Sequence, residues 1–257
     1  MASEMMTEII NWLFEYKRKT NCKGVVLGIS GGKDSTVVAM LAKKVWGDNV
    51  FGVMMPDGDQ KDIADSIAVC SAIGIKSALV NIGQAVSDII CTINSSIPTI
   101  DVTPKSITNI APRVRMTTLY AIAQSLGFRV IGTGNASESY IGWTTKWGDS
   151  AYDINPIYHL TCSEVIELGL ELAKEFELPE SLIIKKPSDG LTGKTDEENF
   201  GFSYHLLDRW ILFGEIENSN TDAIALIERM HSISEHKREM PVVLRREVRE
   251  ENTGEMK

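Results

Sequence analysis

The sequence predicts an α/β fold, a doubly wound open parallel sheet with helices on both faces. Short apolar runs alternate along the chain with longer segments of helical periodicity, the pattern of strands joined by crossover helices. The first apolar run ends in a glycine-rich turn directly before a helix, the position where open α/β sheets bind ligands. The chain has 257 residues, 43% of them hydrophobic, which suffices for one domain with a core of its own.

The first four elements follow this alternation. Helical spacing of apolar residues predicts a helix over 7–19. Residues 24–29 (GVVLGI) form a short apolar run, typical of a strand buried on both faces. A second helix has its apolar residues at positions 37, 38, 41 and 45. Residues 49–55 form the second strand, which ends at the turn sequence Pro56-Asp57-Gly58.

The alternation continues to the fourth strand. A helix, a strand and a helix are expected over 62–72, 76–82 and 85–93. Pro112 is expected to open the next helix, because an N–H at the first helical position has no partner in any case. Residues 128–131 (FRVI) form the fourth strand, which ends at Gly132-Thr133-Gly134.

The last third is predicted to be helical, with one polar interruption. Thr161 and Glu164 form a capping box, which marks the start of a helix. Residues 185–201 are polar and glycine-rich, and we expect a flexible lid loop there. Two shorter helices are expected over 205–213 and 221–230, and a charged tail after residue 232. Residues 1–257 are therefore expected to form a single domain.

Composition excludes several classes of protein. Lys and Arg number 26 against 35 Asp and Glu, which gives a net charge of −9, so no nucleic-acid partner is expected. The four cysteines form no C-x-x-C pair, which argues against a zinc ribbon or a thioredoxin motif. We find no signal-peptide pattern and no run near the ~18 apolar residues of a membrane span. We therefore expect a soluble, cytoplasmic protein without a membrane partner.

The most informative motif is Ser30-Gly31-Gly32-Lys33-Asp34-Ser35, between the first strand and the second helix. Adjacent glycines let backbone N–H groups approach an anion, and the helix N-terminus adds partial positive charge. An aspartate would repel a phosphate unless a cation intervened, so we interpret Asp34 as a Mg²⁺ ligand. The spacing differs from a Walker A loop, in which lysine directly precedes Ser or Thr. A turn that merely joins a strand to a helix is the alternative.

The S-G-G-x-D-S sequence resembles the pyrophosphate loop of the N-type ATP pyrophosphatases, and the chain resembles the ammonia-dependent NAD synthetases within that superfamily. The resemblance runs from about residue 24 to residue 241. Four further segments carry it by their order and spacing: 109–116 (NIAPRVRM), 132–138 (GTGNASE), 145–156 (TKWGDSAYDINP) and 235–238 (EHKR). It implies an adenine nucleotide alpha hydrolase-like fold.

The resemblance also implies a reaction, that of an AMP-forming ligase. The nicotinate carboxylate of deamido-NAD attacks the α-phosphorus of ATP and pyrophosphate leaves. Ammonia then attacks the adenylated carbonyl, which gives NAD and AMP. Mg²⁺ is the implied cofactor, and a homodimer that shares the dinucleotide site is the implied assembly. A glutamine-using relative needs a glutaminase domain of ~200 or more residues, so we expect free ammonia here.

Carried over residue by residue, the resemblance implies sets of site residues. The ATP-binding set is Gly28, Ile29, Ser30, Gly31, Gly32, Lys33, Asp34, Ser35, Thr133 and Ser188. The deamido-NAD-binding set is Arg113, Lys146, Asp153, His236 and Lys237. The metal ligands are Asp34 and Glu138, and the catalytic residues are Asp149, Asp34 and Lys146. We expect Asp149 to help ammonium lose its proton, with Asp189 as the second choice.

Plain structural roles stay open for several of these residues. Glu138 can stabilise a helix N-terminus, and Thr133 can cap a turn. Arg113 can pair with a surface carboxylate, although a cation at a helix start favours an anionic ligand. His236 and Lys237 can belong to a solvated tail.

The chain departs from the family pattern in three places. Many members have an ATP-binding lysine where this chain has Cys162, and we expect helix N–H groups to replace that charge in part. Lys33 stands where glutamine is common and adds charge to the loop. The lid sequence 187–191 (PSDGL) also differs, which affects the ATP contacts expected of Lys185, Lys186 and Ser188.

Two other functions stay open at this point. A tRNA-modifying ATP pyrophosphatase predicts a basic RNA surface and paired cysteines, which the net charge and the isolated cysteines disfavour. A non-catalytic nucleotide-binding module predicts ATP binding without pyrophosphate release, and Cys162 is its support.

Overall fold

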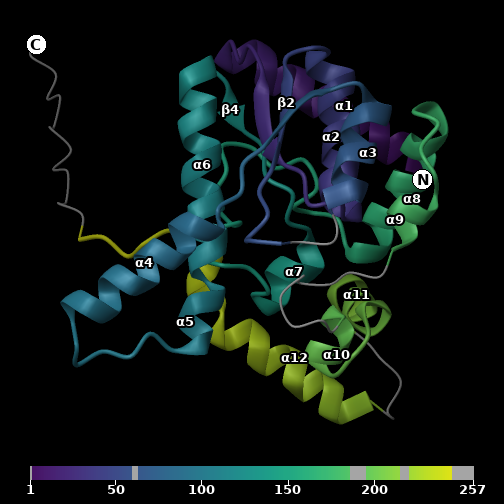
Figure 1. Ribbon diagram of the computed structural model, residues 1–257. Coiled ribbons are helices and arrows are strands. Elements are labelled where there is room, and N and C mark those ends of the chain that lie inside the picture. The colour runs from purple at the N-terminus through teal and green to yellow at the C-terminus, as the bar shows by residue number, and fades with distance from the viewer. Residues whose placement is uncertain (1, 60–62, 186–194, 215–219, 245–257) are drawn as a thin grey trace, which may run out of the picture.

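The protein has the open α/β architecture that the sequence predicts (Figure 1). The computed structural model describes residues 2–59, 63–185, 195–214 and 220–244. Among them are four parallel strands in the order β3-β2-β1-β4: β1 (Val25–Gly28), β2 (Val50–Met54), β3 (Lys76–Leu79) and β4 (Arg129–Val130). Val25 is in register with Val50 of β2 and with Arg129 of β4. The strand order thus reverses beside β1, where ligands bind in such sheets.

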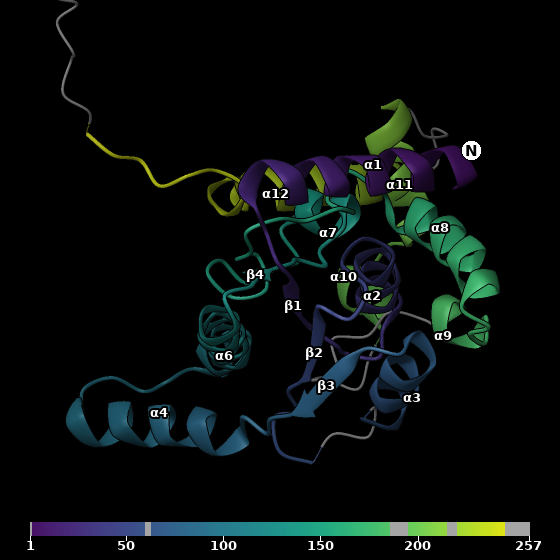
Figure 2. The same ribbon diagram turned by 90° about the horizontal axis from the view of Figure 1, so that it is seen from above.

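Helices cover both faces of the sheet, because successive residues of β1 point to opposite sides. Val25 and Leu27 pack with α2 (Lys33–Trp46) and α3 (Ile63–Ile73), and α1 (Ala2–Thr20) and α8 (Cys162–Glu175) lie over α2. Val26 packs with α4 (Gly83–Ser96) and α6 (Ile110–Leu126). Figure 2 shows α2 and α6 on opposite sides of the strands.

A smaller helical layer closes the carboxyl end of the sheet (Figure 1). It consists of α7 (Ala136–Ile141), α10 (Asp196–Phe200), α11 (Tyr204–Phe213) and α12 (Thr221–Ile233). Phe200, Leu207 and Ile227 form its core together with Cys162 at the start of α8. This layer brings the N-termini of α7, α8 and α11 toward the loop that follows β1.

Short helices are the elements that we did not predict. α5 (Pro104–Thr108), α7, α9 (Ser181–Ile184) and α10 have at most six residues, too few to show a helical period. α10 lies inside 185–201, where we expected only loop. The helix forms there because Thr195 and Glu198 make a capping box at its start. The expected loop is therefore wrong for α10. Residues 186–194 lie outside the described residues.

One helix boundary differs from expectation for a local reason. α6 begins at Ile110, two residues before Pro112, which we expected to open it. The proline is tolerated there because N–H groups of the first turn have no partner inside the helix.

α4 and α5 form a limb that projects from the sheet (Figure 1). In the described part of the chain, no helix combines the length and the apolar content needed to cross a membrane.

Candidate active site

The loop between β1 and α2 is a tight turn that requires glycine. Gly31 has φ +77°, a left-handed conformation that disfavours side chains. A Cβ at Gly31 would lie 3.1 Å from the side chains of Asp65 and Ser66 on α3. Ser30 N donates a hydrogen bond to Ser35 Oγ at 3.3 Å, which closes the loop. Both the backbone conformation and the close approach of α3 therefore explain this glycine.

α2 begins in this loop without a side-chain cap. Its N-cap residue, Gly32, offers no side-chain hydrogen bond, and N–H groups of a first turn have no partner inside their own helix. By contrast, Asn135, Thr161 and Ser203 cap α7, α8 and α11. The start of α2 thus presents N–H donors and the positive end of the helix dipole, which suits an anion such as phosphate.

Asn135 ties the loop after β4 to the loop after β1. Its Nδ2 donates to Asp34 Oδ1 at 2.9 Å. Its backbone N donates to Glu138 Oε2 at 3.2 Å, and its Oδ1 accepts from Glu138 N at 2.9 Å. One buried asparagine therefore contacts both carboxylates that we predict as metal ligands. Glu138 also has the helix-capping role that we weighed as the alternative.

Asp34 and Glu138 form an oxygen-donor pair that fits Mg²⁺. Loss of solvation and the nearby charge of Asp34 raise the pKa of Glu138 to about 8. The two carboxylates thus repel each other, and a divalent cation would relieve that repulsion. The described residues contain no metal-binding group of three or more His, Cys, Asp or Glu. Mg²⁺ is often held by one or two carboxylates together with substrate phosphates, which matches this pair.

Lys33 is buried beside the carboxylate pair. Its side chain is 2% exposed, and its Nζ lies 2.8 Å from Asp34 Oδ2. Nζ is also 5.7 Å from the ring centre of Tyr204 on α11. Burial lowers the pKa of Lys33, but the charges of Asp34 and other neighbours outweigh it and hold the pKa above its ordinary value. Lys33 therefore remains a cation at a helix N-terminus, a place that favours anions.

The start of α8 does not provide the N–H donors that we expected to compensate for Cys162. Cys162 N donates to Ser137 Oγ at 2.9 Å, and Ser163 N donates to Asp208 Oδ2 at 2.8 Å. The capping box engages the next N–H of the helix. That expectation is therefore wrong. Burial raises the pKa of the Cys162 thiol to about 12, so the side chain is neutral at physiological pH.

The carboxyl group of Asp149, our expected base for ammonium, is turned toward the protein. Its Oδ1 accepts a hydrogen bond from Thr145 N at 2.7 Å. Although the residue as a whole is exposed, loss of solvation at the carboxyl raises the pKa of Asp149, against the nearby charges of Lys237 and Arg115. Its own charge contributes to the raised pKa of Glu138, so Asp149 lies within electrostatic reach of the predicted metal ligands.

Four of the five residues expected to bind the dinucleotide meet around 142–149. Lys146 Nζ donates to His236 O, and Arg113 Nε donates to Lys146 O at 3.3 Å. Lys237 Nζ donates to two backbone carbonyls of this segment, at 2.7 Å each. Lys237 therefore folds against its own subunit, whereas His236 takes part through its backbone carbonyl and is itself exposed.

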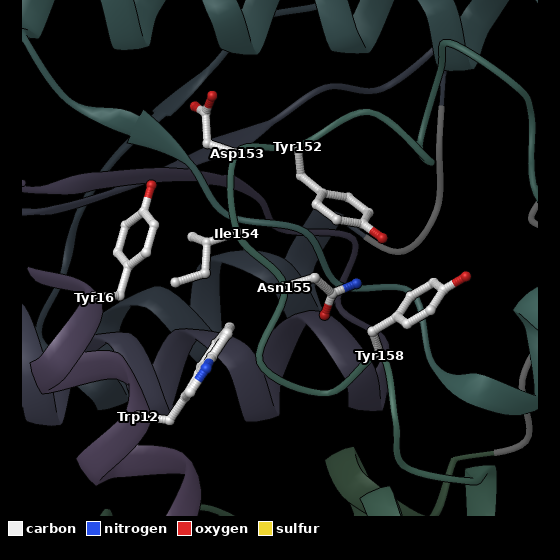
Figure 3. A pocket seen from close by; sticks show the side chains of 7 residues that line it. All are labelled: Trp12, Tyr16, Tyr152, Asp153, Ile154, Asn155 and Tyr158. Atoms are coloured by element: carbon white, nitrogen blue, oxygen red, sulfur yellow. The ribbon is translucent and has the colours of Figure 1, made fainter. Parts of the chain in front are cut away.

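The fifth residue, Asp153, lies on the wall of a cavity beside β4 (Figure 3). Asp153 Oδ2 accepts a hydrogen bond from Val130 N at 2.7 Å. The cavity has a volume of about 290 Å³, and α1 and the segment after Ala151 line it: Trp12, Tyr16, Tyr152, Asp153, Ile154, Asn155 and Tyr158. Aromatic rings thus line an open pocket at the edge of the sheet, and the Asp153 carboxyl lies beside it and points away from Trp12 and Tyr158 (Figure 3).

The remaining expected ATP contacts have mixed placements. Gly28 ends β1, and Ile29 is a core residue whose backbone N already donates to Val53 O at 2.9 Å. Thr133 is partly buried in the loop after β4. Ser188 lies outside the described residues, as do Lys186 and Asp189. Lys185 is described, and its Nζ donates to Asp65 Oδ2 at 2.8 Å.

A known protein family matches this chain over most of its length. Residues 5–241 match the family model described as NAD synthase. The chain belongs to the NAD synthase family. An NH(3)-dependent NAD(+) synthetase of Pyrococcus furiosus is 40% identical over 248 residues, which cover 91% of this chain and 93% of that protein. Another, of Carboxydothermus hydrogenoformans, is 37% identical over 242 residues, which cover 93% and 96% of the two chains.

Solved structures share the fold of this NAD synthase family member. The structure of NMN synthetase from Francisella tularensis superposes with a TM-score of 0.85 at 31% sequence identity. The match covers 95% of this chain and 98% of that one. The similarity therefore extends over nearly the whole length of both chains.

Asp208 is a residue of the NAD synthase fold that our sequence analysis missed. It is buried on α11 and accepts hydrogen bonds from Ser137 Oγ at 2.5 Å and from Ser163 N at 2.8 Å. One carboxylate thus joins the starts of α7 and α8 to α11. A lone aspartate within a helical segment gives no sequence signal for such a role.

Arg238 is the second residue whose role we missed, although the 235–238 motif contains it. Its guanidinium donates to the carbonyls of Ser139 and Tyr140 at 3.1 and 3.0 Å, at the end of α7. It also donates to His231 O at 2.6 Å and to Ser234 Oγ at 2.8 Å, at the end of α12. Arg238 therefore fastens the helix that carries Glu138 to α12 of the same subunit.

Proposed function

We propose that this protein is an ammonia-dependent NAD synthetase. It is an AMP-forming ligase that adenylates the nicotinate carboxylate of deamido-NAD with ATP and amidates it with free ammonia. The single observation that supports this most is the uncapped start of α2 beside Asp34, an anion site next to a carboxylate that can bind a divalent cation. The names of its relatives support the same activity.

In the first step, the residues around the loop bind ATP and the leaving pyrophosphate. The N–H groups at the start of α2 bind the oxygens of the pyrophosphate, and the hydroxyls of Ser30 and Ser35 add hydrogen-bond donors. Asp34 and Glu138 would hold Mg²⁺, and a bound Mg²⁺ would supply positive charge to offset that of the phosphates. The nicotinate carboxylate attacks the α-phosphorus, and the bond from that phosphorus to the pyrophosphate breaks. Adenylate and pyrophosphate result.

The dinucleotide lies across the segment 142–149 and the cavity of Asp153. Arg113, Lys146 and Lys237 come together there and offset the charge of its two phosphates. The aromatic wall of the cavity suits a nucleobase, and Asp153 suits a hydroxyl or amino group.

In the second step, Asp149 attracts ammonium and accepts a proton from it. Ammonia then attacks the activated carbonyl, AMP leaves, and the amide of NAD forms. The support is the placement of the Asp149 carboxyl, which faces the protein within electrostatic reach of Glu138. A carboxylate whose pKa is raised is a better proton acceptor than an ordinary aspartate.

We also propose a homodimer. α1 packs Ile9 and Leu13 into its own core but leaves Trp12 49% exposed. The limb of α4 and α5 leaves Ile97 and Ile100 exposed, at 42% and 52%. Apolar side chains gathered on a projecting limb suit burial against a second copy of the chain.

Nicotinate mononucleotide is a second candidate for the carboxylate substrate. The Francisella tularensis structure with the TM-score of 0.85 is that of an NMN synthetase. The same adenylation and amidation would then act on a molecule that lacks the adenylate half of deamido-NAD.

The test measures pyrophosphate release with ATP, Mg²⁺ and one carboxylate at a time, followed by amide formation when ammonium is added. We expect release to require deamido-NAD and NAD to form only with ammonium. Faster turnover with nicotinate mononucleotide would favour the second candidate. Equal pyrophosphate release without either carboxylate would refute both.

A further inference from the structure

The ammonium group of Lys33 lies at the carboxylates that we expect to hold the metal. Asp34 Oδ2 pairs with Lys33 Nζ at 2.8 Å, while Asp34 Oδ1 accepts from Asn135 Nδ2 at 2.9 Å. The charge of Glu138 also acts on Lys33. Among the described residues, the Lys33 cation thus contacts Asp34 and lies within reach of the charge of Glu138.

This cation is buried and has few hydrogen-bond partners among the described residues. Lys33 is 3% exposed as a whole residue, and an ammonium group has three protons to donate. Within the described residues, its one hydrogen bond goes to Asp34. The remaining contact is the face of the Tyr204 ring, 5.7 Å away. The Lys33 ammonium group can thus donate further hydrogen bonds, in an enclosed place beside an anion site.

Across the loop, the start of α8 offers no positive side chain for this role among the residues that the structure describes. Cys162 is neutral, and the first N–H groups of α8 already donate to Ser137 and Asp208. Without Lys33, the charge of Asp34 beside Glu138 would lose the one ion pair that the described residues give it, at a cost in free energy. Lys33 is therefore the group that offsets the charge of Asp34 before an ion arrives.

We propose that Lys33 occupies the divalent-ion position in the nucleotide-free protein and moves from Asp34 to the ATP phosphates when ion and nucleotide bind together. The inference rests on the proposed function. An ammonium and a divalent ion beside the same carboxylate repel each other, and the triphosphate offers the ammonium a new partner. The ion alone therefore binds weakly, and ATP strengthens its binding.

The test measures Mn²⁺ binding without nucleotide by electron paramagnetic resonance, and compares Lys33→Gln with the unmodified protein. We expect Lys33→Gln to bind Mn²⁺ more tightly, on the order of tenfold, because a competing charge is gone. Metal-free ATP should bind more weakly to the variant, and calorimetry measures this affinity. Lys44→Gln is the matched control, since Lys44 lies on the same helix but pairs with Glu175, and both affinities should stay unchanged.

Unchanged or weaker Mn²⁺ binding by a folded Lys33→Gln protein would overturn the inference, even if the unmodified protein makes NAD normally. If the variant does not fold, a crystal structure of the unmodified protein with Mn²⁺ and a non-hydrolysable ATP analogue decides the question. We expect Mn²⁺ between Asp34 and Glu138 and Lys33 Nζ on a phosphate oxygen. An ammonium still paired with Asp34 beside the ion would contradict the proposal.

Discussion

At the scale of single residues, the sequence predicts where the backbone needs a glycine. It does not predict which distant side chains surround a residue. The turn at Gly31 is predictable because two adjacent glycines after an apolar run suit few other conformations. The place of the Lys33 ammonium depends on Tyr204, which is remote in sequence. The same holds for Cys162, whose N–H group is engaged by Ser137.

Replacement of Asp149 tests its role as the acceptor of the ammonium proton. We expect Asp149→Asn to slow NAD formation about a hundredfold or more, the usual contribution of a general base. Pyrophosphate release should continue, because the first step does not need this base. The ratio of pyrophosphate to NAD in one assay measures the effect. Asp222→Asn, on the first turn of α12, is the control, and an unchanged ratio in Asp149→Asn would contradict the role.

Cysteine labelling tests the surroundings of Cys162. Burial raises its pKa to about 12, so about one thiol in ten thousand is ionised at pH 8. Cys91 is exposed, so iodoacetamide should modify Cys91 in the folded protein and leave Cys162 unmodified. Raising the pH to 9 increases the thiolate fraction of Cys162 but leaves it very small. Mass spectrometry of peptides reads the sites, and equal labelling of both cysteines before unfolding would show that Cys162 is not buried.

At the scale of elements, long helices follow from periodicity and helix starts follow from capping residues. The box of Thr161 and Glu164 is confirmed at the start of α8. The same pattern of Asn135 and Glu138 begins α7, but with six residues that helix shows no period of its own. What holds α7 in place comes from later in the chain, from Asp208 and Arg238.

Arg238 should matter both for stability and for the metal site. We expect Arg238→Gln to lower the free energy of unfolding by about 2 kcal/mol, since several hydrogen bonds from one charged group are lost. The Mg²⁺ concentration for half-maximal pyrophosphate release should rise, because α7 carries Glu138. Urea unfolding and a Mg²⁺ titration measure the two effects. Arg229→Gln, exposed on α12, should change neither. A loss of stability with an unchanged Mg²⁺ requirement would limit Arg238 to a structural role.

At the scale of the whole molecule, the alternation of strands and helices predicts the parallel sheet but not the order β3-β2-β1-β4. Nor does it predict the projecting limb, since α4 and α5 look like ordinary crossover segments in sequence. Strand order depends on which side of β1 the chain returns to, and β4 returns to the side opposite β2.

The limb leads to a prediction about assembly. We expect light scattering to give twice the chain mass of 28.4 kDa. Changing both Ile97 and Ile100 to Asp should give a folded monomer, because charge on both would oppose burial. Ile67→Asp is the control, an isoleucine on α3 that is 48% exposed. A dimer that persists in the double variant would place the interface elsewhere.

The contact between Asn135 and Asp34 spans 101 positions of the chain. During synthesis, a ribosome completes the glycine turn long before it adds the asparagine that fixes the neighbouring carboxylate. The two halves of the candidate site therefore meet only after β4 has been made and has joined the sheet beside β1.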